Sequence, residues 1–417
     1  MTCLYYNIGF LGGLHPLNTP LRGAELAVFP SINDAYLITE GNKIMAYGSM
    51  QDFSPANYSI THRVDVDKGA LLPSWCDSHT HIVFAGSREN EFVDKIKGLS
   101  YAEIAAKGGG ILNSAIKLQQ TDSQELYELA LERVREVVQA GTGAIEIKSG
   151  YGLTLEAELK MLRVIKRLKE NTPVHIRATF LGAHAFPTIY KNNPDGYIKL
   201  LLTEMIPAIV KEDLAEYIDV FCEEGFFSPA QTALICEAGI KAGLRPRIHA
   251  NQLAISGGVQ VGVSLGAISV DHLESMDEAA MKALSSSSTI GTLLPNASYF
   301  LRMQDAPARK LIDNGSIIAL ASDFNPGSAP SGNMNDVVAQ ACIRMRMLPE
   351  EAFNAATING ACAMELENQC GSIQVGKIAN FFITKPIPSL AYYPYAFGSN
   401  LITKVVLQGK EIHHSSF

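Results

Sequence analysis

The sequence predicts an α/β fold, a (β/α)8 TIM-type barrel with a small β-sandwich built from both chain ends. Short apolar runs alternate with longer helical patterns in the middle of the chain, whereas both ends are rich in short strands and turns. Eight such units in about 250 residues is the size of this barrel. The barrel is expected at residues 71–370 and the sandwich at 1–70 together with 371–417. A doubly wound parallel sheet is the alternative for the same pattern.

The expected barrel strands are apolar runs short enough to be buried strands. The first run leads from Leu71 to His81. The others lie at residues 144–148, 174–180, 217–222, 246–249, 267–272, 289–294 and 316–321.

Helical patterns lie between most of these runs. Apolar residues recur at helical spacing between a possible cap at Asp122 and a stop at Gly141, and again from Thr154 to Leu168. We expect these helices to pack on the outside of the sheet. At the chain ends, strand patterns such as 35–47 and 403–412 predict the sandwich.

Composition excludes several classes of protein. Hydrophobic residues make up 47% of the chain and charged residues 18%, as in a globular protein with a large core. The net charge of −8 and the absence of a Lys/Arg run argue against a nucleic-acid partner. No apolar stretch approaches the roughly 18 residues of a membrane helix, and the start lacks a signal-peptide pattern. The 7 cysteines are scattered without Cys-x-x-Cys spacing, so we expect reduced thiols and a cytoplasmic location.

Two histidines, His79 and His81, end the first expected strand. Residues i and i+2 of a strand point to the same side, so both imidazoles face one point. Imidazole is a good ligand for zinc and divalent iron. Such a pair is weak evidence alone, because it also fits two polar residues at a strand exit.

Further polar residues fall at the same end of the expected barrel, where functional residues of this architecture gather. His184 follows the third strand, His249 and His272 end the fifth and sixth, and Asp323 ends the eighth. A helix cap is the alternative role for Asp323, and a satisfied buried histidine is the alternative for His272. Taken together, the placement favours a metal enzyme.

A set of four ligands with an open position for water would fit one catalytic Zn²⁺ or Fe²⁺. Such a metal would lower the pKa of a water and polarise an electrophilic carbon. The fourth strand, ending at residues 221–224, offers no lysine that could be carboxylated to bridge two metals, and Lys148 ends the second strand instead. One metal per chain is therefore expected. The expected ligands are His79, His81, His249 and Asp323.

Five longer motifs are more specific than His-x-His. They are HTHIVFAGSR at 79–88, EIKSGYGL at 146–153, TFLGAH at 179–184, FCEEG at 221–225 and SDFNPGS at 322–328. In these motifs the chain resembles the amidohydrolase superfamily, and within it the imidazolonepropionase family, over nearly its whole length. Where the superfamily usually has Asp, this chain has Asn380, which we interpret as a turn variation without catalytic consequence.

The resemblance implies hydrolysis of the ring amide of 4-imidazolone-5-propanoate to N-formimidoyl-L-glutamate, a step of histidine degradation. It also implies the four metal ligands above and a homodimer. An arginine fork suits the carboxylate of this small-molecule substrate. The residues implied around the substrate or product are Arg88, Tyr101, Tyr151, His184, Gln252, Asn325, Gly327 and Ser328.

The expected catalytic groups are His272 and Asp323. His272 would take the proton of the attacking water or hydrogen-bond the developing oxyanion, and either His272 or Asp323 would protonate the leaving ring nitrogen. Many relatives have glutamate where this chain has Gln252, and glutamine cannot shuttle protons. Gln252 is therefore expected to recognise the ring amide. The glycine run 108–110 is expected to form a flexible loop, a lid near the active-site mouth.

Two alternatives to this function stay open at this point. Another cyclic amide hydrolase or a heterocycle deaminase would use the same metal site, although Gln252 makes the deaminase less favourable. A metal-free relative that acts in binding or assembly is the other alternative, and the presence of all four expected ligands argues against it.

Overall fold

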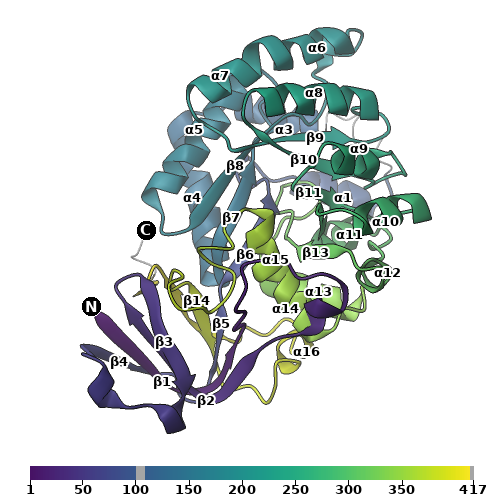
Figure 1. Cartoon of the computed structure of the whole chain (residues 1–417). Helices are drawn as coiled ribbons and strands as arrows, with labels where there is room; N and C mark the ends of the chain where they lie inside the picture. Colours follow the sequence, from purple (N-terminus) through teal and green to yellow (C-terminus); the bar gives the residue numbers. More distant parts are fainter. Residues whose placement is uncertain (100–108, 414–417) are drawn as a thin grey trace.

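The computed structural model describes residues 1–99 and 109–413. Its centre is a nearly closed barrel of eight parallel strands in the order β13-β12-β11-β10-β9-β8-β7-β6, and a separate sheet from both termini lies beside it (Figure 1). The predicted fold class is thus confirmed. The barrel strands are β6 Trp75–Thr80, β7 Thr142–Lys148, β8 His175–Ala183, β9 Tyr217–Cys222, β10 Arg245–Ala250, β11 Ser269–His272, β12 Ile290–Leu293 and β13 Ile317–Leu320.

The first and last barrel strands meet at their C-terminal ends. Asp323 donates its backbone N–H to the carbonyl of His79 at 3.0 Å, and His81 donates to Phe324 at 2.9 Å. An isolated parallel bridge joins Thr80 to Phe324. These contacts close the barrel beside two histidines and one aspartate that were expected to bind metal.

Helices surround the barrel, and several begin at the caps that the sequence offers. Asp122 accepts from Gln124 at the start of α4, and Thr154 accepts from Ala157 at the start of α5. The helices are α1 Glu89–Ile96, α3 Ile111–Gln120, α4 Ser123–Gln139, α5 Leu155–Asn171, α6 Pro194–Leu200, α7 Ile206–Lys211, α8 Pro229–Lys241, α9 Gly258–Ser264, α10 Glu278–Ser285, α11 Pro295–Leu301, α12 Ala308–Asp313, α13 Met334–Ile343, α14 Pro349–Ala356, α15 Ile358–Ala363 and α16 Tyr392–Tyr395.

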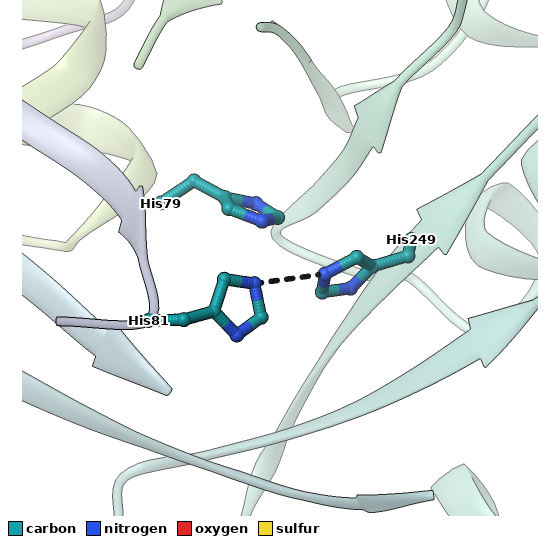
Figure 2. Close-up of side chains that lie close together, drawn as sticks. All are labelled: His79, His81 and His249. Carbon is teal, nitrogen blue, oxygen red and sulfur yellow. Dashed lines mark hydrogen bonds between the residues drawn. The ribbon is translucent and has the colours of Figure 1, made fainter. Parts of the chain in front are cut away.

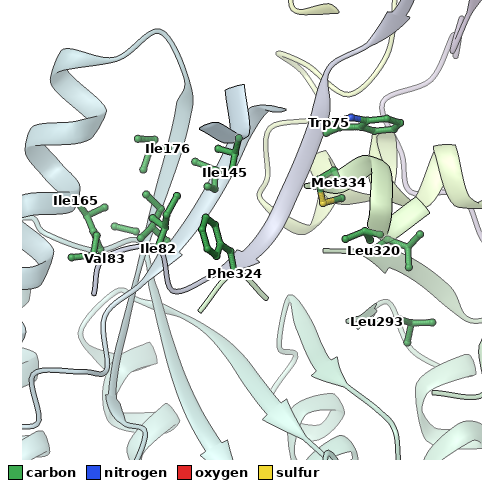
Figure 3. Close-up of a cluster of buried hydrophobic side chains, with 14 of the residues drawn as sticks. Trp75, Ile82, Val83, Ile145, Ile165, Ile176, Leu293, Leu320, Phe324 and Met334 are labelled. Atoms are coloured by element: carbon green, nitrogen blue, oxygen red, sulfur yellow. The ribbon is translucent and has the colours of Figure 1, made fainter. Parts of the chain in front are cut away.

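The main core lies between the barrel and these helices. Ile145 of β7, Ile176 of β8 and Ile165 of α5 belong to one buried apolar cluster (Figure 3). Alternation along a strand turns the neighbouring Glu146 to the opposite side, into the barrel. Among the described residues, no helix is long and apolar enough to cross a membrane.

The terminal sheet joins the two ends of the chain through β5 and β14, which pair antiparallel. Its strands form one hydrogen-bonded network, and the register of β1 against β2 shifts between Tyr5 and Ile8. The strands are β1 Thr2–Gly12, β2 Ser31–Glu40, β3 Lys43–Ser49, β4 His62–Asp65, β5 Ala70–Pro73, β14 Phe381–Thr384, β15 Ile402–Leu407 and β16 Lys410–Glu411.

The run expected as a single first strand is divided in the structure. Ala70–Pro73 is β5 of the terminal sheet, and the barrel strand β6 begins only at Trp75. Between them, Ser74 donates its backbone N–H to Asn380, so the chain passes from one sheet to the other here. Hydrophobicity is continuous across this point, which explains why the pattern did not reveal the break.

The segment between the first two barrel strands contains the helices α1, α3 and α4. Gly110 has φ +89° and precedes α3, a conformation that suits glycine at a helix start. Gly108, the first residue of the expected lid, lies outside the described residues, as does Tyr101.

Candidate active site

Three histidine rings converge at the C-terminal end of the barrel (Figure 2). His79 comes from β6, His81 follows β6 directly, and His249 comes from β10. The Nε2 atoms of His81 and His249 are 3.4 Å apart. Asp323, just after β13, places Oδ1 3.5 Å from Nε2 of both His79 and His81. The four residues expected as metal ligands are therefore brought to one point.

The donor set fits a divalent metal ion. The Nε2 atom of His79 is buried and has no hydrogen-bond partner within the described part of the chain. Ligand atoms of His79, His81 and His249 lie within 4.8 Å of one another, as do those of His79, His272 and Asp323. Three imidazole nitrogens and one carboxylate oxygen are the donors that zinc and ferrous iron accept.

Two buried carboxylates orient two of the three histidines through hydrogen bonds to Nδ1. Asp271 Oδ2 lies 2.7 Å from Nδ1 of His79, and Asp219 Oδ2 lies 3.0 Å from Nδ1 of His249. A carboxylate accepts the Nδ1 proton, which leaves the Nε2 lone pair directed at the common point.

These carboxylates belong to an ionic network inside the barrel. The ammonium of Lys148 lies 2.9 Å from both Glu146 Oε1 and Asp219 Oδ2, and 3.7 Å from Asp271 Oδ2. The pKa of Lys148 is raised because these anions outweigh the effect of burial. Lys148 therefore balances part of the negative charge of the buried acids below the site, and Arg247, 3.6 Å from Asp271 Oδ2, adds a second positive charge.

The histidines differ in charge. Burial lowers the pKa of His79 and His81 well below the ordinary value and also lowers that of His249, so all three are neutral and can bind metal. Burial opposes protonation of His272 as well, but Glu274, 3.4 Å from Nδ1, attracts the charged form and raises its pKa. Burial raises the pKa of Asp323 to about 7, and a cation at the common point would oppose this effect.

A cavity of about 350 Å³ opens onto these groups. Every residue expected around the substrate lines it, apart from Tyr101, which lies outside the described residues. The expected residues in its wall are Arg88, Tyr151, His184, Gln252, Asn325, Gly327 and Ser328.

Arg88 presents a positive charge to the cavity. Its Nε donates to Ser114 Oγ at 2.8 Å, which fixes one edge of the guanidinium. Its Nη2 is buried and finds no hydrogen-bond partner among the described residues. Such a fork is prepared to bind an anionic group of a ligand.

His184 offers an acceptor. Its Nδ1 lies 2.9 Å from the carbonyl of Gly150, and a carbonyl only accepts, so this nitrogen carries the proton. Burial lowers the pKa of His184 to about 3, so the ring is neutral and Nε2 is left as an acceptor.

Curated relatives identify the family. The chain is 55% identical to an imidazolonepropionase of Flavobacterium johnsoniae over 94% of this chain and 95% of the relative. It is 52% identical to an imidazolonepropionase of Christiangramia forsetii over 99% of this chain and 100% of the relative. The chain belongs to the imidazolonepropionase family. A model described as the amidohydrolase family matches residues 245–412.

Solved structures similar to this imidazolonepropionase-family chain agree on the fold. An adenosine deaminase of Xanthomonas campestris with bound zinc is 16% identical, with a TM-score of 0.72 over 98% of this chain and 92% of the other. The guanine deaminase of E. coli is 13% identical, with a TM-score of 0.73 over 99% of both chains. At this identity the likeness shows the fold alone.

Sequence reasoning about this family member missed the groups that orient the ligands. Asp219 and Asp271 are fully buried, Asp219 within the largely apolar strand β9 and Asp271 directly before His272 in β11. Glu274 follows His272 by two residues. An acidic residue facing into a barrel is a usable signal, because an uncompensated buried charge is costly. Lys95 also lines the cavity and donates to the carbonyl of Gly327 at 3.0 Å.

Asn325 lines the cavity, and its side-chain amide is also hydrogen-bonded within the turn after β13. Its Nδ2 donates to the carbonyl of Asp323 and to Ser328 Oγ, both at 2.7 Å. Its Oδ1 accepts the backbone N–H groups of Gly327 and Ser328 at 2.8 Å. In this imidazolonepropionase-family chain the amide of Asn325 thus shapes the turn after β13.

Proposed function

We propose that the chain hydrolyses the ring amide of 4-imidazolone-5-propanoate to N-formimidoyl-L-glutamate. The observation that carries the proposal is one cavity with a cluster of metal-binding type on its wall and the guanidinium of Arg88 beside it. This substrate combines an amide carbonyl with a carboxylate, so it needs both groups. The relatives named imidazolonepropionase, at 52% and 55% identity, support the same reaction.

The substrate is held by groups of matching chemistry. Arg88 pairs with the propanoate carboxylate through its fork. His184 accepts a ring N–H through Nε2, and the Gln252 amide hydrogen-bonds the ring amide. Tyr151, Gly327 and Ser328 complete the wall, and Asn325 acts by fixing the turn that carries the last two.

His79, His81, His249 and Asp323 would hold one Zn²⁺ or Fe²⁺ per chain. When bound, such an ion supplies Lewis acidity to a carbonyl oxygen and lowers the pKa of a water.

Protein groups complete the reaction. Glu274 favours the protonated form of His272 and raises its pKa, and in that form His272 donates a hydrogen bond to the oxygen on which negative charge develops. A water oxygen bonds to the carbonyl carbon, the bond from that carbon to the ring nitrogen breaks, and Asp323 carries the water's proton to this nitrogen. Gln252 has no proton to shuttle and takes no part in this transfer.

The test follows the ultraviolet absorbance of imidazolonepropionate with protein of measured metal content. We expect rapid loss with formiminoglutamate as the product, and little loss for Asp323→Asn. No loss from metal-loaded protein would overturn the substrate and point to another cyclic amide or a heterocycle deaminase. No loss together with no bound metal would point to a binding relative.

We also propose a cytoplasmic homodimer. The family resemblance supports the dimer, and 7 free cysteines, of which 6 are buried, support a reducing compartment. A sizing column coupled to light scattering tests the dimer, because a monomeric mass would contradict it.

A further inference from the structure

We propose that Glu158 is a positioning residue that holds Tyr151 and His184 in the substrate cavity. The inference rests on the proposed function, which places both residues at the substrate. Glu158 lies in the first turn of α5 and is fully buried.

The carboxylate of Glu158 binds the backbone of the loop that follows β7. Oε1 accepts from the N–H groups of Gly152 and Leu153, both at 2.8 Å, and Oε2 accepts from Gly150 at 3.1 Å. The Ser149 hydroxyl also hydrogen-bonds to this carboxylate. An anion thus sits in a concave group of backbone donors, an arrangement that fixes the path of the chain.

The loop needs such an anchor because its backbone is unusual. Gly150 has φ +104°, and Leu153 adopts φ +56°, which non-glycine residues rarely do. A Cβ on Gly152 would overlap the backbone nitrogen of Glu158, so the loop packs directly on the helix. The backbone of the 146–153 motif therefore forms a binding site for the buried carboxylate of Glu158.

Two cavity residues depend on this loop. Tyr151 lies between the residues that Glu158 binds, and its ring centroid is 5.9 Å from that of His81. The carbonyl of Gly150 accepts the Nδ1 proton of His184, so the same loop sets the orientation of that ring. Glu158 acts through both residues without lining the cavity itself.

Glu158→Gln is the direct test. It places an amide N–H₂ either opposite the N–H of Gly150 or opposite the N–H groups of Gly152 and Leu153, so donors face each other. We expect kcat/KM for imidazolonepropionate to fall about 10- to 100-fold, mostly through KM, because small displacements of binding groups have effects of this size. We also expect faster hydrogen exchange at Gly150, Gly152 and Leu153 without substrate, and unchanged metal content.

Glu351→Gln is the matched control. Glu351 is equally buried, caps α14 and pairs with Arg309, away from the cavity. It should lower the melting temperature without changing KM. Ser149→Ala removes one bond to Glu158 and also the bond that Ser149 Oγ accepts from the N–H of Leu181 at 3.0 Å. It should shift KM and hydrogen exchange at Gly150, Gly152 and Leu153 in the same direction by a smaller factor, and it serves if Glu158→Gln does not fold.

The outcomes separate the two proposals. A KM of wild-type size in Glu158→Gln, or in Ser149→Ala where the first variant does not fold, overturns the positioning role. Equal KM changes in Glu158→Gln and Glu351→Gln overturn it as well, since they show general destabilisation. Failure of the wild-type protein to hydrolyse imidazolonepropionate overturns the proposed function. Faster hydrogen exchange at Gly150, Gly152 and Leu153 in Glu158→Gln would still show that Glu158 holds the loop.

Discussion

Gly327 and Arg88 are in direct contact across the cavity wall. A Cβ on Gly327 would overlap Nη1 of Arg88, the end of a flexible side chain. Gly327 therefore determines where the guanidinium lies, in addition to any contact it makes with a ligand.

Gly327→Ala should displace the guanidinium without unfolding the protein. We expect KM to rise about 10-fold with a small change in melting temperature, because a modest misplacement weakens binding while a side-chain end can move aside. Steady-state kinetics and calorimetry measure both. Gly86→Ala is the control, since the nearest atom to its added Cβ is Lys117 Cδ at 3.7 Å. A wild-type KM for Gly327→Ala would contradict the contact.

Arg88→Lys should weaken substrate binding while keeping the charge. Loss of a charge-assisted fork costs about 1.5–3 kcal/mol, roughly 10- to 150-fold in KM. The propanoate methyl ester provides the control substrate, because it lacks the anion that Arg88 is proposed to bind. The variant and the wild-type protein should hydrolyse the ester with similar kcat/KM. An equal loss on both substrates would mean that Arg88 does not bind the carboxylate.

Asp271→Asn should weaken metal binding. The carboxylate fixes the tautomer of His79, and removal of such a partner lowers metal affinity about 10- to 100-fold. Competition with a chelator, followed by metal analysis, measures the change. Glu351→Gln, buried in another part of the fold, should keep wild-type affinity. Unchanged metal affinity in Asp271→Asn would show that the contact of Asp271 with His79 does not contribute to metal binding.

The metal-free protein should lose stability as pH falls below about 6.5. Burial lowers the pKa of His184 to about 3 in the folded state, whereas an unfolded histidine has a pKa near 6.5. The unfolded state thus binds more protons between these values, so stability is complete above pH 6.5 and is lost toward pH 3.

Urea unfolding at pH 7 and pH 5 tests this linkage. His184 alone should contribute about 2 kcal/mol to the difference. His184→Asn should reduce the difference by that amount, while His62→Asn, at an exposed position, should leave it unchanged. The same pH dependence in His184→Asn and the wild-type protein would refute the assignment.

The barrel and the site were predictable for a common reason. Strand period and chain order place His79, His249 and Asp323 at C-terminal strand ends, and a parallel barrel brings these ends together. The anchor formed by Glu158 could not be predicted, because it binds backbone N–H groups whose directions no residue pattern encodes. The break at Ser74 was missed because it depends on pairing of β5 with β14, from the other end of the chain.

The hydrogen-bonded contact between the ends of β6 and β13, which closes the barrel, has a consequence for how the site forms during synthesis. Asp323 is a proposed ligand and also closes the barrel through its backbone bond to His79. A chain still on the ribosome that has not yet extended past β13 carries the three histidines of the proposed ligand set. It lacks both the carboxylate of Asp323 and the contact that closes the barrel. The complete set of proposed ligands can therefore assemble only after synthesis has passed β13, the last strand of the barrel.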